Sequence, residues 1–470
     1  MSALVMKFGG TSVGSAAAMA QAGKIVSREA GNWDRVVVVV SALSGVTDML
    51  IDGAKSAADG DGSRHREIAE ALRTRHREMA ASLIGRPDER EGIEKAIDSY
   101  LAEFSRLCAS VAVLRELTPR ALDGIVSFGE RLSARLFAAV LREAGLRSEP
   151  VDATELIVTD NTFQNAVPLP APTQDRISAR LSPLLDRGIV PVVPGFIGAT
   201  EAGVTTTLGR GGSDYTAAIL GDMLKCDAVW IFTDVDGVMT ADPRIVPDAR
   251  VIPVISYTEV GELAYFGAKV LHPRTIRPVI EHGIPLWVKN TFNPEAPGTR
   301  IVRAPQNTNG TVKAITVITD LTMVNVEGRG MIGVPGIAGR TFSAVARADA
   351  NVLMISQASS EQSICFIVPT EKAAAVVHGL EEEFAHELRR RDIDRIWSQD
   401  GVVIISAVGA GMRGTPGIAG RIFGTLGWSG INVIAIAQGS SECSVSLVVD
   451  AADAIAAVRE IHKEVIRNGR

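Results

Sequence analysis

An internal repeat in the second half of the chain constrains the fold more than any other feature of the sequence. Residues 324–368, VNVEGRGMIGVPGIAGRTFSAVARADANVLMISQASSEQSICFIV, align without a gap on residues 405–449, ISAVGAGMRGTPGIAGRIFGTLGWSGINVIAIAQGSSECSVSLVV. Each copy predicts a strand, a glycine-rich turn, a helix, two strands joined by a Ser-Ser-Glu turn, and a second helix at about 371–386 or 451–467. This β-α-β-β-α order lacks one strand of the ferredoxin-like unit.

The missing strands predict that the first repeat is inserted inside the second. Residues 394–399, DRIWSQ, can supply the last strand of the first copy, but the second copy reaches the C-terminus without one. Residues 311–318, TVKAITVI, precede the first copy and offer the spare strand. The repeat region is expected to span 304–470. Within it, the inserted first repeat covers about 321–400, and the second repeat combines about 311–320 with 401–470.

Upstream of the repeats, alternating strands and helices predict an α/β domain at 1–303. Three segments rich in Val and Ile end in Gly or Ser clusters, as buried parallel strands do: 35–42, 188–198 and 226–237. Residues 63–118 lack such strands and predict charged, amphipathic helices that form a helical subdomain on the sheet. The segments 290–301 and 304–310 are rich in turn residues and mark the boundary before the repeats.

The composition is that of a folded protein of several domains. A chain of 470 residues, with 46% hydrophobic and 22% charged residues, exceeds one hydrophobic core. A formal charge of −6 without a basic block argues against nucleic acid or an anionic membrane as partner. The four cysteines show no CxxC spacing, and no apolar run approaches the roughly 18 residues of a membrane span. We therefore expect a reduced, cytoplasmic protein, mature from Met1 because no signal peptide pattern follows it.

The segment 7–14, KFGGTSVG, stands where a short strand turns into a helix. Glycines allow backbone N–H groups to approach a phosphate closely, and the helix N-terminus adds partial positive charge. Lys7 adds a full charge. The lysine precedes the glycines, so the Walker pattern is absent, and a plain strand-to-helix turn remains the alternative.

Two later loops also contain charged residues where the chain turns. Residues 205–218, TTTLGRGGSDYTAA, place Arg210 and Asp214 in a glycine-rich turn before a helix of small residues. Residues 233–244, TDVDGVMTADPR, follow a strand and are rich in aspartate. A calcium loop is excluded because its twelfth position is Arg244, and a solvated acidic turn is the alternative.

Three shorter motifs contain candidate residues, each with a structural alternative. Lys269 lies between apolar residues in FGAKVLHPRT, as a lysine lying along an apolar surface also does. Glu130 in VSFGERLS stands at an expected helix start, where a carboxylate can simply stabilise the helix end. Ser41, Ser44 and Thr47 in SALSGVTD follow a strand, where hydroxyl groups commonly stabilise turns.

The order of these segments resembles the aspartate kinases of the amino acid kinase family over nearly the whole chain. The matching blocks are KFGGTSVG, VVVVVSALSGVTD, SFGERLS, GFIG, TTLGRGGSD, TDVDGV, ADPR and FGAKVLHP, and the tail resembles the paired ACT domains of that family. The resemblance implies an α/β fold, an amino acid kinase-type parallel-sheet sandwich with a helical insertion, and two ferredoxin-like (βαββαβ) ACT domains. It is nearest to monofunctional enzymes of the threonine-sensitive type, since a fused homoserine dehydrogenase has no room in 470 residues.

The reaction implied by the resemblance transfers the γ-phosphoryl group of ATP to the side-chain carboxylate of L-aspartate, giving 4-phospho-L-aspartate and ADP. Lys7 and Asp214 would be catalytic, with Lys7 on the β- and γ-phosphates and Asp214 positioning the lysine. The implied ATP contacts are Lys7, Gly9, Gly10, Thr11, Ser12, Thr233, Asp234, Arg244 and Lys269. The implied aspartate contacts are Ser41, Thr47, Glu130, Arg210 and Asp214. Arg210 would bind a carboxylate and Glu130 the ammonium group.

Three further features refine this expectation. Mg²⁺ would bridge phosphate oxygens mostly through water, so we expect no firm protein ligand for it. Met239 stands where relatives often have tyrosine near the nucleotide, which implies altered nucleotide affinity. An aspartate carboxylate is already ionised at neutral pH and needs no general base. In agreement, the seven histidines all lie outside the glycine-rich loops: His65, His76, His272, His282, His378, His386 and His462.

Equivalent polar residues in the two repeats predict two pseudo-equivalent sites for a small molecule. Gln357 and Gln438 occupy matching places, and Asn351 and Asn432 precede matching strands; the alternative is that they close hydrogen bonds at strand ends. In relatives with this tail, a pathway amino acid binds between ACT units and inhibits. We favour threonine over lysine as the inhibitor, at the first step of the lysine, threonine and methionine branch. Exposed sheet edges of ACT domains predict a homodimer or homotetramer.

Two alternative functions share part of these features. Another amino acid kinase, acting on acetylglutamate, glutamate, UMP or carbamate, would share the phosphate loops, but the ACT pair and the helical insertion argue against it. An amino acid sensor built on a decayed kinase scaffold would lack phosphate-binding residues. Lys7, Asp214, Arg244 and Lys269 are all present.

Overall fold

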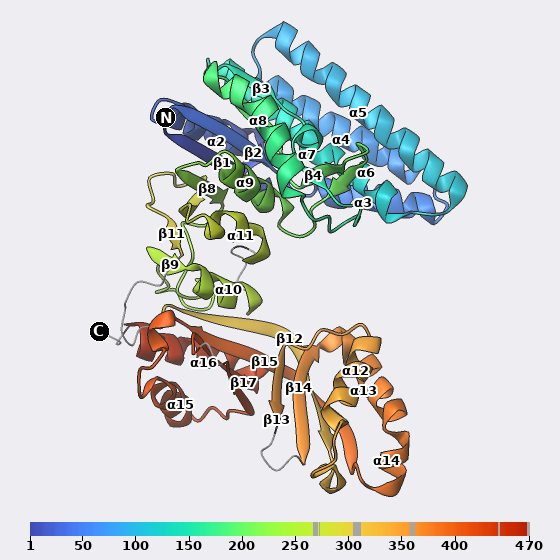
Figure 1. The fold of residues 1–470 in the computed structure, drawn as a ribbon, viewed down its shortest axis with the longest axis vertical. Helices are drawn as coiled ribbons and strands as arrows, with labels where there is room; N and C mark the ends of the chain where they lie inside the picture. The colour runs from blue at the N-terminus through green and yellow to red at the C-terminus, as the bar shows by residue number, and fades with distance from the viewer. Residues whose placement is uncertain (267–270, 272, 304–311, 358–361, 440–441, 468–470) are drawn as a thin grey trace. The chain divides into compact units, whose positions relative to one another are not determined.

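The computed structural model describes two compact units of the chain (Figure 1). The residues described are 1–266, 271, 273–303, 312–357, 362–439 and 442–467. The first unit comprises Met1–Val238, Pro253–Tyr257 and Leu271–Ala304. The second comprises Met239–Ile252, Thr258–Val270 and Pro305–Arg470, so it takes in two segments that precede the repeats.

The first unit is built on an eight-stranded sheet that is parallel except at one pair. Its order is β3-β5-β2-β1-β8-β10-β11-β9, and β10 and β11 are antiparallel. The strands are β1 (Ala3–Phe8), β2 (Arg35–Val40), β3 (Ser148–Pro150), β5 (Val190–Pro194), β8 (Ala228–Thr233), β9 (Val254–Ser256), β10 (Leu286–Asn290) and β11 (Thr299–Val302). A second, three-stranded sheet contains β4 (Val158–Thr159), β6 (Ile197–Thr200) and β7 (Thr205–Thr207). This confirms the predicted α/β class.

The helices of the first unit begin where the sequence provides caps. Ser15 accepts a hydrogen bond from the Ala18 N–H at the start of α2, and Thr118 caps α6 ahead of Pro119. The predicted helical subdomain is the pair α4 and α5. The helices are α1 (Gly10–Val13), α2 (Ala16–Ala30), α3 (Val46–Ala58), α4 (Arg64–Leu83), α5 (Pro87–Leu114), α6 (Pro119–Val126), α7 (Phe128–Glu143), α8 (Pro170–Asp186), α9 (Gly212–Met223) and α11 (Pro273–Glu281), with a short 3₁₀ turn at Ala153–Glu155.

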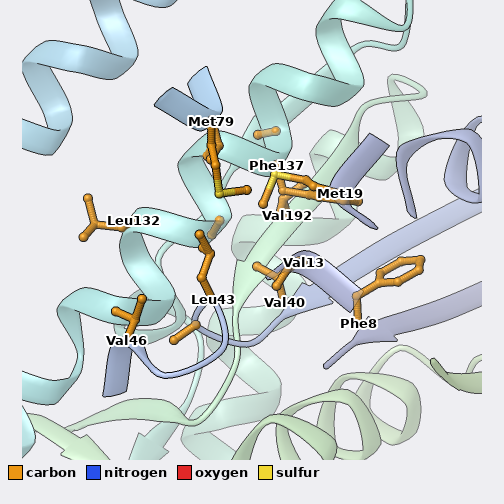
Figure 2. Close-up of a cluster of buried hydrophobic side chains, with 14 of the residues drawn as sticks. Phe8, Val13, Met19, Val40, Leu43, Val46, Met79, Leu132, Phe137 and Val192 are labelled. Atoms are coloured by element: carbon orange, nitrogen blue, oxygen red, sulfur yellow. The ribbon is translucent and has the colours of Figure 1, made fainter. Parts of the chain in front are cut away.

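One apolar cluster joins the sheet to the helices that cover it. Figure 2 shows Val40 of β2 beside Val13 of α1 and Leu43 of the following loop, with Met79 of α4 and Phe137 of α7 above them. Burying a side chain of this size stabilises a fold by about 1.5–3 kcal/mol relative to exposure. The loops that follow β1 and β2 are therefore anchored in this core through Val13 and Leu43.

The second unit contains a six-stranded antiparallel sheet in the order β13-β14-β12-β15-β17-β16. Residues Ala314–Ile318 of β12 pair with Ile404–Val408 of β15, and residues Leu321–Glu327 pair with Arg395–Val402, so each long strand serves both repeats. The ladder is irregular between Ile318 and Thr322. The strands are β12 (Ala314–Glu327), β13 (Met354–Gln357), β14 (Ser363–Pro369), β15 (Arg395–Val408), β16 (Ala435–Gln438) and β17 (Ser444–Asp450).

The second unit contains the helices predicted for the two repeats: α12 (Ile337–Arg347) and α13 (Thr370–Glu383) in the first, and α15 (Ile418–Trp428) and α16 (Ala454–His462) in the second. Two further helices did not follow from the repeat pattern, namely α10 (Tyr257–Tyr265, of which Tyr257 belongs to the first unit) and α14 (Ala385–Arg390). A π-helical turn lies at Lys463–Arg467, and 3₁₀ turns lie at Arg329–Met331, Ala410–Met412 and Ala451–Asp453. Two ferredoxin-like units are thereby confirmed. Their Ser-Ser-Glu turns fall largely outside the described residues.

Two sequence expectations differ from the structure in detail. The turn-rich segment 290–301 also contains the start of β11, because Thr299–Val302 pairs with β10 and β9. The other turn-rich segment, 304–310, lies outside the described residues. Among the helices that are described, none combines the length and the apolar character needed to cross a membrane.

Candidate active site

Several loops of the first unit meet at one edge of its parallel sheet. The neighbouring strands β5, β2, β1 and β8 run in the same direction and end at Pro194, Val40, Phe8 and Thr233. The loops that follow them therefore emerge together, at the edge where α/β proteins commonly bind ligands. This edge includes three of the predicted segments: Gly9–Ser12, Ser41–Thr47 and Thr233–Asp234.

Lys7 and Asp214 form an ion pair at this edge. Lys7 is the second-last residue of β1, and Asp214 lies in the first turn of α9, whose N-terminus favours a negative charge. The distance from Lys7 Nζ to Asp214 Oδ1 is 2.6 Å, and the two side chains are 11% and 16% exposed. The carboxylate therefore holds the lysine ammonium in place.

A cavity of about 470 Å³ lies beside this ion pair. It brings together both residues predicted as catalytic and all of those predicted to contact aspartate: Lys7, Ser41, Thr47, Glu130, Arg210 and Asp214. The other lining residues come from α3, α6, β7, the loops at residues 164 and 196, the turn before α9 and the start of α9: Ile51, Leu122, Asp123, Val126, Gln164, Phe196, Thr207, Gly209, Gly211, Gly212 and Ser213.

Glycines shape the loop that carries Arg210. Gly209 and Gly211 have φ angles of 76° and 73°, in the left-handed region that side chains disfavour. The exposed Arg210 stands between them. This tight turn leads directly into α9, so the guanidinium and the Lys7–Asp214 pair border the same cavity.

Glu130 is a buried carboxyl group on the cavity wall. It lies in the first turn of α7 and is 4% exposed, and burial raises its pKa to about 8, against smaller lowering contributions from hydrogen bonds with the backbone of Ala42 and of Glu130 itself. Its Oε2 atom has no hydrogen-bond partner within the described part of the chain. A carboxyl group in this state is suited to a cationic ligand, which would supply the missing partner.

Asp123 is a cavity residue that the sequence did not reveal. Its carboxylate accepts hydrogen bonds from the Thr207 N–H at 3.0 Å, the Thr207 hydroxyl at 2.7 Å and the Gln164 N–H at 2.9 Å. Burial raises its pKa, although these hydrogen bonds act in the opposite direction. Asp123 thereby fixes the end of β7 just before the Arg210 turn. The only available signal was an aspartate within the amphipathic helix PRALDGIV.

Some groups of the first glycine-rich loop already have protein partners. The Gly9 N–H donates to the Phe232 carbonyl at 3.2 Å, and the buried Ser12 hydroxyl accepts from Thr291 Oγ1 at 2.6 Å and donates to Phe232 O at 3.5 Å. These bonds tie the loop to β8 and to the residue that follows β10. Thr11 is exposed, and the Thr233 hydroxyl donates to Asp234 at 3.1 Å.

The remaining predicted nucleotide residues do not belong to the described part of the first unit. Arg244 belongs to the second unit, where its 87% exposed side chain pairs with Asp242 at 2.6 Å. Met239 is in the same unit and forms a bridge with Val251. Lys269 lies outside the described residues. Within the described ranges, no group of three or more His, Cys, Asp or Glu side chains could hold a metal ion.

The predicted effector residues all lie in the second unit. Gln357, at the end of β13, borders a cavity of about 270 Å³ beside the start of α12. Asn351, Asn432 and Gln438 are exposed. The cavity is otherwise lined by apolar residues and the glycine-rich turn: Met331, Gly333, Val334, Pro335, Gly336, Ile337, Ala338 and Ile364.

The fold and the cavity define an α/β unit with a pocket at the carboxyl ends of its parallel strands, of the class that the resemblance to amino acid kinases implies, together with two ferredoxin-like units. Comparison with known families agrees with this class. Residues 2–290 match the family described as "Amino acid kinase family". Residues 324–384 and 405–465 each match the ACT domain.

Similar proteins narrow the class further. The chain is 38% identical over 465 residues to the bifunctional aspartokinase/homoserine dehydrogenase 1 of Arabidopsis thaliana, covering 97% of this chain and 50% of that protein. It is 34% identical to aspartokinase 1 of the same plant, covering 99% of this chain and 80% of that protein. The chain thus spans about half the length of the bifunctional relatives it matches.

Two crystal structures of aspartokinase III from E. coli are also similar. Both are 30% identical and cover 98% of this chain and 99% of that one. The complex with aspartate and ADP, called the R-state, has a TM-score of 0.79; the complex with lysine and aspartate, called the T-state, has a TM-score of 0.81. The chain therefore belongs to the amino acid kinase family, and within it to the aspartokinases.

Proposed function

We propose that the protein transfers the γ-phosphoryl group of ATP to the side-chain carboxylate of L-aspartate, forming 4-phospho-L-aspartate and ADP. The observation that carries this proposal is one cavity bordered by the Lys7–Asp214 pair, by Arg210 and by the buried Glu130. The E. coli relative, crystallised with aspartate and ADP, supports the choice of both substrates.

Each of these residues has a separate task in the proposal. Lys7 offers its ammonium to the β- and γ-phosphates, where charge builds up during transfer, and Asp214 holds that ammonium in position. Arg210 offers a planar pair of N–H donors to a carboxylate of aspartate. Glu130 receives the ammonium group, while Ser41 and Thr47 line the pocket around the side chain. The acceptor carboxylate is already ionised, so no side chain needs to remove a proton.

ATP would lie along the edge formed by Gly9–Ser12, Thr233 and Asp234, with Arg244 and Lys269 as further contacts. Free N–H groups of a glycine-rich loop and the Lys7 ammonium suit a phosphate chain. Mg²⁺ would accompany ATP, held mostly through water, and would neutralise charge on the phosphate oxygens.

An acceptor assay tests this proposal directly. ADP release is measured with aspartate, glutamate and homoserine as acceptors, and the acyl phosphate is trapped with hydroxylamine. We expect ADP release with aspartate but not with glutamate or homoserine, and we expect hydroxylamine to trap the product as a hydroxamate. Phosphorylation of homoserine instead would move the acceptor from a carboxylate to a hydroxyl group and overturn the substrate assignment.

The pKa of Glu130 predicts a pH dependence of aspartate binding. With a pKa raised to about 8, Glu130 of the empty site is protonated and neutral at pH 7. An ammonium group binds the carboxylate form, so aspartate binding must release this proton. The KM for aspartate is therefore expected to fall as pH rises from about 6 to about 8, by up to about tenfold per unit, and to level off above.

The variant Glu130→Gln provides the control, because it keeps the size of the side chain and removes its titration. We expect it to raise the KM for aspartate and to abolish the change with pH, while the KM for ATP stays near that of the wild type. A wild-type KM for aspartate that is flat between pH 6 and 8 would contradict the assigned partner of the ammonium group.

We further propose that the ACT domains bind an inhibitory amino acid, threonine in preference to lysine, at sites that include Asn351, Gln357, Asn432 and Gln438. The cavity beside Gln357 supports this placement. We also propose a domain boundary between residues 303 and 304, with the first ACT repeat inserted in the second. The proposed reaction is the first step of the lysine, threonine and methionine branch. The ADP-release assay, repeated in the presence of threonine or lysine, identifies the inhibitor. Inhibition by lysine alone would overturn the assignment of threonine.

The proposed assembly is a homodimer or homotetramer formed through the ACT domains. The edge strands β13 and β16 support it, since Ile355 and Ile436, at matching repeat positions, are 49% and 46% exposed. Light scattering after size exclusion would measure the mass. We also propose a cytoplasmic location, because the four cysteines are far apart in the sequence and show no CxxC spacing.

A further inference from the structure

Arg75 of the helical subdomain contacts two loops of the candidate active site. Its Nη1 group donates to the Ser44 carbonyl at 2.9 Å, and its Nη2 group donates to the Gly14 carbonyl at 3.0 Å. Gly14 ends α1, which follows the glycines of the first loop. Ser44 lies between Ser41 and Thr47. One guanidinium therefore bridges the loop assigned to ATP and the loop assigned to aspartate.

The two loops are packed closely where Arg75 bridges them. A Cβ added to Gly14 would lie 3.2 Å from Ser44 Cβ and 2.8 Å from the Gly10 carbonyl, so the approach depends on this glycine. Val13 and Leu43, which immediately precede the two carbonyl-bearing residues, lie in the buried cluster of Figure 2.

The helix that carries Arg75 is anchored in the same cluster. Met79, one turn further along α4, is among its labelled side chains in Figure 2, and Leu72 and His76 on the same side of the helix are also buried. The half-buried Arg75 is thus held between a fixed helix and the two loops. Its guanidinium supplies two N–H donors in a rigid plane, whereas a lysine would offer one mobile ammonium group.

We propose that Arg75 is a positioning residue for phosphoryl transfer, which fixes the ATP loop and the aspartate loop relative to each other. The inference rests on the proposed function. Arg75 touches neither substrate in this account; it sets the separation between the γ-phosphate and the acceptor carboxylate. A displacement of about 1 Å between reacting groups can cost on the order of 100-fold in rate.

Kinetics of three variants test the proposal. Arg75→Ala is expected to lower kcat about 10- to 100-fold, with the KM values for ATP and aspartate within about threefold of the wild type, because each loop still binds its own ligand. The kcat of Arg75→Lys should lie between those of Arg75→Ala and the wild type. Arg77→Ala is the matched control, since Arg77 stands on the same helix and contacts Asp98 at 2.7 Å. It should retain the wild-type kcat.

Chemical rescue separates positioning from general stability. Guanidinium ions at millimolar concentration, far below denaturing levels, should restore part of the kcat of Arg75→Ala and leave Arg77→Ala unchanged. A kcat of Arg75→Ala equal to that of Arg77→Ala would overturn the proposal. The proposal would also be overturned if guanidinium did not restore the kcat of Arg75→Ala and the variant also unfolded at a lower midpoint than the wild type.

Hydrogen exchange provides a readout that needs no activity. Backbone amides in 9–14 and 41–47 should exchange faster in Arg75→Ala than in the wild type, and at wild-type rates in Arg77→Ala. Unchanged exchange in both segments would overturn the bridge. If the wild type fails to phosphorylate aspartate, the proposed function fails, and faster exchange of both segments would still support Arg75 as the bridge for whichever acceptor is used.

Discussion

Replacing Lys7 with alanine is expected to lower kcat for phosphoryl transfer by about 1000-fold or more and to leave the fold intact. The Lys7 ammonium, 2.6 Å from Asp214 and on the wall of the cavity, is the charge that meets the phosphates in the proposed reaction. Removing a single preorganised group that stabilises transition-state charge typically costs about 100- to 1000-fold, and charged groups in phosphoryl transfer cost more. The backbone of Lys7 keeps its parallel partners Val39 and Ile231, so β1 should still form.

Coupled ADP-release kinetics measure this effect, and circular dichroism with a thermal unfolding curve checks the fold. Lys24→Ala is the matched control, because Lys24 is an exposed lysine on α2. Asp214→Asn should retain the lysine but free it from its ion pair, giving a smaller loss than Lys7→Ala. Turnover of Lys7→Ala at the wild-type rate would remove Lys7 from the mechanism.

The meeting of the loops after β1, β2 and β8 follows from topology, because neighbouring parallel strands end at one edge of their sheet. The loop of Arg210 follows β7 of the three-stranded sheet, so this rule does not place it. The pairing of Lys7 with Asp214 required more than topology, since it depends on how α9 packs beside β1. The family resemblance supplied that relation, whereas residue spacing alone could not.

Asp123 and Arg75 show what the sequence could not reveal. Asp123 lies in a short amphipathic helix and Arg75 in the charged stretch RTRHRE, and both patterns are typical of solvated helix faces. Their contacts are with backbone groups of distant loops, Thr207 and Gln164 for the first and Gly14 and Ser44 for the second. Any residue type can present such backbone groups, so no local pattern marks the partner.

The shared strands of the second unit were only partly predictable. The repeat indicated that a strand was missing, and residues 311–318 were its predicted source. The structure shows that β12 continues as one strand to Glu327 through an irregular step near Asp320, which has a φ angle of 61°. Thr319 and Asp320 are residue types typical of turns, so the sequence favoured a break at that point.

A buried ion pair of the second unit predicts the largest change in stability. Lys313 Nζ lies 2.9 Å from Glu259 Oε2, with the side chains 8% and 0% exposed, and Glu259 Oε1 accepts from the Ala410 N–H at 2.8 Å. Lys313→Met keeps the length of the side chain but removes the ammonium group that contacts the buried Glu259 carboxylate. We expect the free energy of unfolding of this unit to fall by about 3–5 kcal/mol.

Hydrogen exchange of the β12 and β15 amides measures this change for the second unit by itself. Lys372→Met is the control, since its pair with Asp349 joins side chains that are 35% and 97% exposed and should contribute less than about 1 kcal/mol. Removing both charges, in Lys313→Met with Glu259→Gln, should recover more than half of the loss, because the cost comes from an uncompensated charge and not from lost packing. A double variant as unstable as Lys313→Met would assign the effect to packing instead.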